Sequence, residues 1–206
     1  MKQLSSKIVC GIAAVITFFW GVLSMALNGA SKAEATGSLK IVVWYMVLQS
    51  FLFVLLSVAA ILRITANKKT AALQKGVYAV ATVIAALYSL LLAINIAPQI
   101  SSLFTATFWK QSGAVMALAE PLLYLIQGIL LAVLSADMLR GKLTRRGELT
   151  RIATGCVILS LIPYAVQFFG VGLQLVLTVG AGLVLAVLTV CQAGVVYTAF
   201  VPIVEG

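Results

Sequence analysis

The chain has 206 residues, of which 63% are hydrophobic and only 9% carry a charge, whereas a soluble domain is about half apolar and ~25% charged. This composition excludes a soluble globular fold. The formal net charge is +9, but the lysines and arginines are scattered through short connections between apolar runs, without a nucleic-acid-binding motif, which argues against a nucleic-acid partner.

Six apolar runs follow one another along the chain, and each is long enough to cross about 30 Å of hydrocarbon as a helix. They cover residues 8–28, 41–62, 76–97, 114–136, 152–169 and 171–199. The fifth is the shortest, and only Gly170 with its neighbours separates it from the sixth. The sequence therefore predicts an all-α, polytopic membrane bundle of six transmembrane helices, with residues 1–206 forming one transmembrane domain.

The first run follows Lys2 and Lys7 and is followed by Ala33-Glu34-Ala35, a combination that also occurs in secretory signal peptides. Its apolar part of about 20 residues exceeds the ~7 to 15 of a signal peptide. We therefore interpret this run as a true membrane span.

Basic residues are divided unevenly between alternate connections. Only three of the 14, Lys32, Lys40 and Lys110, lie on one side of the predicted topology. Because cytoplasmic connections carry the excess of lysine and arginine, we expect a multi-pass protein of the cell membrane with both termini in the cytoplasm. The cluster from Arg140 to Arg151 fits this asymmetry, and we favour that interpretation over a docking site for a cytoplasmic partner or anionic lipid.

The residue types that serve catalysis and metal binding are scarce. The chain has no histidine, the commonest general base and metal ligand. Cys10, Cys156 and Cys191 lie inside apolar runs without CxxC spacing, so we interpret them as structural thiols. A single intramembrane carboxylate is a poor set for acid–base chemistry. We expect no enzymatic activity, no metal and no cofactor.

That carboxylate, Glu120, stands directly before Pro121 in the fourth apolar run. A charged side chain within a membrane helix costs ~2.5 to 3.5 kcal/mol on insertion scales, and it usually faces a protein interior or a wet cavity. The proline leaves the carbonyl of Ala117 without its helical partner, so that oxygen also needs a neighbour. We expect Glu120 to face the bundle interior in the extracytoplasmic half.

Large polar side chains gather at about this depth in the predicted topology. They are Asn28, Tyr45, Gln49, Asn95, Glu120, Tyr124, Tyr164, Gln167 and Gln174. Apolar walls with a few converging polar groups are typical of small-molecule sites. The predicted ligand-binding set is Glu120, Tyr124, Gln49, Asn95, Tyr164, Gln167 and Gln174.

Glu120 would orient the ligand in this site, either ionised against a cation or protonated as a hydrogen-bond donor. The competing interpretation is structural: Glu120 bonds Asn95, Gln167 or Gln174 and pins the helices together.

Two functional classes follow. The first is binding or transport of a small molecule: six spans in 206 residues, with short loops and polarity near the outside, resemble in architecture the substrate-binding subunits of energy-coupling-factor vitamin importers. The resemblance implies that the small-residue face of the first helix meets a partner membrane subunit. That face comprises Cys10, Ala14, Thr17, Gly21, Ser24 and Asn28.

The alternative is a non-catalytic membrane subunit or scaffold. Small residues one helical turn apart, such as Ala81 with Ala85, would then be interfaces with partner membrane proteins. We do not expect a channel, because neither a ring of charged residues nor a carbonyl-rich filter sequence occurs.

Overall fold

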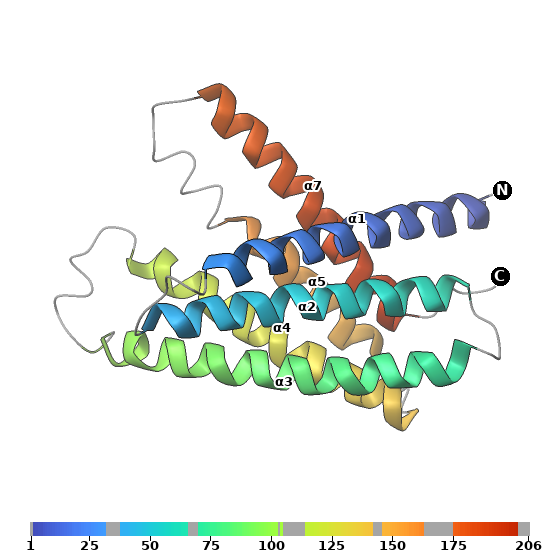
Figure 1. Ribbon diagram of the computed structural model, residues 1–206, viewed down its shortest axis with the longest axis horizontal. Helices are drawn as coiled ribbons and strands as arrows, with labels where there is room; N and C mark the ends of the chain where they lie inside the picture. Colours follow the sequence, from blue (N-terminus) through green and yellow to red (C-terminus); the bar gives the residue numbers. More distant parts are fainter. Residues whose placement is uncertain are drawn as a thin grey trace.

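The computed structural model describes residues 2–31, 38–65, 70–102, 104, 114–141, 146–162 and 175–201. The described residues form six named helices and no strand, which confirms the all-α prediction. The helices are α1 (Lys2–Ser31), α2 (Ser38–Ile64), α3 (Ala71–Ser102), α4 (Ala114–Arg140), α5 (Arg146–Leu159) and α7 (Leu175–Phe200). Figure 1 shows them gathered into one elongated bundle.

Five of the described helices are long and apolar enough to cross a membrane, as expected for a multi-pass membrane protein. These spans are Ser6–Ala30, Lys40–Ile64, Ala71–Ser101, Leu118–Arg140 and Gly182–Phe200. They coincide with five of the six predicted runs. The first part of the remaining run, 152–169, lies in α5, whose named range ends at Leu159, and the rest extends beyond the described residues.

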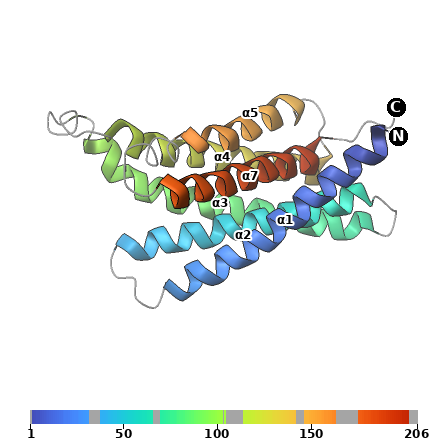
Figure 2. The ribbon, with the colours of Figure 1, turned by 90° about the horizontal axis from the view of Figure 1, so that it is seen from above.

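The helices form a closed ring. Each packs against the next in the order α1, α2, α3, α4, α5 and α7, and α7 closes the ring by packing against α1 and also α2. In Figure 2, α1 runs diagonally across α2. The beginning of α1 and the end of α7 lie at the same end of the bundle, whereas the first half of α7 projects away from its neighbours (Figure 1).

Two clusters of buried side chains fill the ring. The larger joins all six helices and includes Leu56, Leu131 and Phe200, each at most 1% exposed. The smaller lies between α3 and α4, around Tyr88 and Leu92. Because lipid tails are as apolar as leucine, close packing rather than exclusion of water stabilises such a core. Outward-facing side chains such as Phe19 and Leu183 are more than half exposed, as expected for contact with a lipid bilayer.

Small residues allow the closest helix contacts. A Cβ atom on Gly21 of α1 would lie 2.6 Å from Val54 Cγ2 and 3.1 Å from the Ser50 carbonyl oxygen of α2. Ala14 and Thr17, on the same face of α1, are also buried. This face of the first helix packs against α2 of the same chain, and α1 also packs against α7. Contact of α1 with a partner subunit stays a prediction. Ala81 and Ala85 are likewise buried inside this chain.

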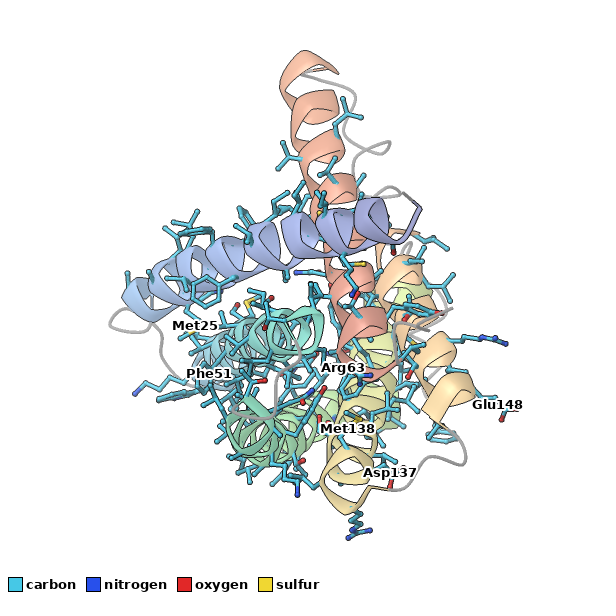
Figure 3. All side chains as sticks on the ribbon, turned by 90° about the vertical axis from the view of Figure 1, so that its right-hand side faces the viewer. Met25, Phe51, Arg63, Asp137, Met138 and Glu148 are labelled. Atoms are coloured by element: carbon cyan, nitrogen blue, oxygen red, sulfur yellow. The ribbon has the colours of Figure 1, made fainter. Side chains whose placement is uncertain are left out.

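A charged cap closes the end of α7. Arg63 Nη1, near the end of α2, donates to the Ala199 carbonyl over 3.0 Å, and the Tyr78 hydroxyl of α3 donates to the same oxygen. Arg63 Nη1 also lies 3.8 Å from Met138 Sδ of α4, and Figure 3 shows Arg63 pointing inward above Met138. The last carbonyls of a helix lack intrahelical partners, and a cation there complements the helix dipole. This contact fastens four helices together.

Replacing Arg63 by methionine should lower the free energy of unfolding by about 1.5 kcal/mol, because the charge-assisted hydrogen bond from half-buried Arg63 to the carbonyl of buried Ala199 is lost. Thermal unfolding of the detergent-solubilised protein, followed by size-exclusion chromatography, measures the change. Lys75→Met removes a charge from an exposed position on α3 and is the matched control. Equal stability of the two variants would show that the cap contributes nothing.

Candidate functional site: a polar cavity inside the helix ring

A cavity of about 220 Å³ lies among α1, α2, α4, α5 and α7. Its described wall consists of Trp20, Ser24, Asn28, Met46, Gln49, Ser50, Phe53, Tyr124, Gln127, Val157, Ser160, Leu185, Leu188, Thr189 and Gln192. Within each helix these residues mostly stand three or four positions apart, as Trp20, Ser24 and Asn28 do, so each helix turns one face to the cavity. α3 contributes nothing to this described wall.

Most hydroxyls of the wall are hydrogen-bonded to the protein. The Ser160 hydroxyl donates to the Val157 carbonyl over 2.7 Å, and the Thr189 hydroxyl donates to the Leu185 carbonyl over 2.8 Å. Such bonds from serine and threonine back to their own helix satisfy the hydroxyl proton. These two hydroxyls therefore keep only acceptor capacity for another molecule.

Ser24 joins α1 to α2 at the side of the cavity. Its Oγ atom lies 3.0 Å from Ser50 Oγ and accepts a hydrogen bond from Asn28 Nδ2 over 3.2 Å. The Ser50 hydroxyl also lies 2.9 Å from the Met46 carbonyl, which competes for its proton. This network explains why the polar stripe of α1 faces α2 rather than lipid.

The carboxamides carry the free hydrogen-bonding capacity of the wall. Four of them, Asn28, Gln49, Gln127 and Gln192, come from four different helices. Gln127 is only 2% exposed, and it lies in the wall of the cavity. Buried polar groups in native proteins nearly always have partners. The interior of the ring thus presents amide donors and acceptors to whatever occupies the cavity.

The described wall of the cavity carries no charge. The described residues of the wall include no aspartate, glutamate, lysine or arginine. Within the part of the chain that the structure describes, no group of three or more histidine, cysteine, aspartate or glutamate side chains is placed to hold a metal ion. The chemistry available in this wall is hydrogen bonding and apolar contact.

Two residues of the predicted ligand-binding set, Gln49 and Tyr124, line the cavity. Glu120 does not. It lies half-buried on α4, one turn and about 6 Å along the helix from Tyr124 and on the same face. Asn95 is half-buried on α3, which is not part of the wall. The other three predicted residues, Tyr164, Gln167 and Gln174, fall outside the described residues.

Several wall residues were not in the predicted set. Gln127 is seven positions after Glu120 and so shares its face of α4, a signal that the sequence does contain. Gln192 lies in the second half of α7 and lines the same cavity. Trp20 lines the cavity while its neighbour Phe19 is 67% exposed. Hydropathy alone cannot distinguish these two aromatic residues.

No protein-family model matches the chain, and no match was found among curated proteins or solved structures. Fold and cavity together define a class: a multi-pass, all-α membrane protein with an interior cavity whose described wall is polar and carries no charged residue. Any more specific assignment depends on the chemistry of that cavity.

Proposed function

We propose that this protein binds a small molecule in the cavity, from the extracytoplasmic side, as a binding or transport component of the cell membrane. The observation that supports this most directly is Gln127, a carboxamide that is 2% exposed and lies in the wall of the cavity. A buried amide that is left without hydrogen-bonding partners costs about 1 to 3 kcal/mol. A ligand that forms hydrogen bonds with this amide avoids that cost.

The position of the cavity along the bundle supports access from the extracytoplasmic side. Gln49 lies near the middle of α2, and Arg63 lies at the end of the helix, roughly 20 Å away along the axis. The larger apolar cluster and the Arg63 cap fill the end nearer Arg63, which carries the excess of basic residues and by the positive-inside rule faces the cytoplasm. The packed end closes the cavity on that side, so the ligand enters from the other.

Native mass spectrometry of the purified protein in detergent tests this proposal. We expect a small-molecule adduct on the wild-type chain that is lost in the Gln127→Leu variant, because leucine removes the amide and keeps similar bulk. Gln74→Leu changes a half-buried glutamine near the start of α3, away from the cavity wall, and should leave the adduct unchanged.

A wild-type protein that carries no adduct, or an adduct that Gln127→Leu retains, would contradict the binding proposal. The chain would then be better described as a non-catalytic membrane subunit or scaffold. Unfolding of Gln127→Leu is excluded as a cause by comparing its size-exclusion profile and thermal midpoint with those of Gln74→Leu.

A further inference from the structure

We infer that the ligand is an uncharged, planar heterocycle with amide-like hydrogen-bonding edges, of the size of a nucleobase or a pyridine carboxamide. This inference rests on the proposed function and specifies the chemical class of its ligand. The inference has three parts. The absence of charge in the described wall indicates that the ligand is neutral, the four carboxamides indicate its hydrogen-bonding edges, and two aromatic side chains together with the cavity volume indicate its shape and size.

Charge complementarity gives the first part. A charged group taken from water into an interior without a partner of opposite sign loses several kcal/mol of solvation. The described wall offers no such partner. Glu120 lies outside the wall, and Arg63 donates to the Ala199 carbonyl at the packed end. The cavity therefore selects a ligand that is neutral at physiological pH.

The carboxamides give the second part. Each presents an oxygen acceptor and two N–H donors in one plane. Asparagine and glutamine use this pairing to bind the edge of adenine with two hydrogen bonds. Asn28, Gln49, Gln127 and Gln192 approach the cavity from four helices, so several edges of one flat ring are within their reach. A heterocycle with adjacent N–H and C=O groups matches this arrangement.

The aromatic side chains and the volume give the third part. Trp20 of α1 and Phe53 of α2 contribute apolar surface to the wall, and aromatic side chains stack on nucleobase-like rings. The volume of about 220 Å³ exceeds the ~150 Å³ of a cavity that holds benzene and is below the ~300 Å³ of the smallest drug-sized pockets. One ring or a fused pair of rings fits, and a nucleotide is both too large and too highly charged.

Matched pairs of neutral and anionic probes test the inference. Isothermal titration calorimetry on the full chain in detergent measures the binding of three neutral heterocycles, uracil, adenine and nicotinamide. The anionic probes are orotate and nicotinate, which are carboxylates of the uracil and pyridine rings. Glucose is the neutral probe that is not a heterocyclic base. We expect at least one neutral heterocycle to bind, its carboxylate counterpart to bind at least about 100-fold more weakly, and Gln127→Leu to weaken the neutral ligand by about tenfold or more. Gln74→Leu should bind like the wild type.

Three results would overturn the ligand class. These are equal or tighter binding of the carboxylate, binding of glucose without any neutral heterocycle, and failure of all three neutral heterocycles to bind. In each case mass spectrometry tests the proposed function separately. An adduct that depends on Gln127 would show that the protein binds a small molecule of a different class, and the absence of such an adduct would contradict both proposals.

Discussion

Replacing Gly128 by leucine should prevent the folded protein from accumulating, and replacing it by alanine should lower the free energy of unfolding by about 1 to 3 kcal/mol. Gly128 lies where α4 crosses α3. A Cβ atom at this position would lie 2.5 Å from Ser89 Oγ and 2.8 Å from two ring carbons of Tyr88. Contacts this short force the neighbouring side chains or the helices themselves to move.

The neighbours of Gly128 have little freedom to move. The Tyr88 ring is 1% exposed and belongs to the smaller apolar cluster, where it packs against Tyr45 with ring centroids 6.5 Å apart. The Ser89 hydroxyl donates to the Ala85 carbonyl over 2.8 Å. Rotating Ser89 away breaks that bond, and shifting Tyr88 disturbs α2 as well. The cost therefore exceeds that of one displaced side chain.

Gly182→Leu is the control for this prediction. Gly182 lies in the membrane-spanning part of α7, and an added Cβ would meet nothing within 4 Å. Thermal midpoints and the yield of monodisperse protein should fall steeply for Gly128→Leu, moderately for Gly128→Ala and little for Gly182→Leu. If the leucine variants at positions 128 and 182 behave alike, the close approach of α3 and α4 does not hold the bundle together.

The sequence predicts the helices of the fold well, because in a membrane protein the length of an apolar run largely determines whether it forms a spanning helix. A backbone crossing the bilayer must satisfy its own hydrogen bonds, so runs such as 41–62 and 76–97 have to be helical whatever their partners. The α2 and α3 helices indeed cover these runs. The orientation of the termini, which depends on charge asymmetry alone, stays a prediction.

The site is harder to predict, because its position depends on how helices rotate and cross. Glu120 stands out in the sequence because a charged side chain is costly to insert into a membrane. The part of α4 that lines the cavity nevertheless begins one turn further along, at Tyr124, and includes Gln127. The spacing of Glu120, Tyr124 and Gln127 predicts that they share one face of α4. The sequence does not predict which residues of α7 lie at the same depth in the bundle. Gln192 reaches the same cavity because α7 closes the ring by packing against α1, α2 and α5, and a linear depth scale cannot show such packing.

Filling the cavity without altering its polar groups should abolish ligand binding while leaving the bundle folded. Leu185 of α7 is half-buried and forms part of the wall, so a tryptophan there occupies space that a ring-sized ligand needs. Since the whole cavity measures only about 220 Å³, both cannot be accommodated. We expect affinity to fall by at least about 100-fold, comparable with the loss of a central anchoring contact.

Leu183→Trp is the matched control for this substitution. Leu183 stands two positions away on the same helix, but its side chain is 63% exposed on the outer surface, where a tryptophan contacts lipid or detergent instead of the cavity. Calorimetric titration with the ligand identified for the wild type should show unchanged affinity for Leu183→Trp and none for Leu185→Trp, with similar thermal midpoints for both. Because the two variants carry the same substitution within one turn of α7, loss of binding in both would mean that α7 as a whole, rather than the cavity wall, controls ligand binding.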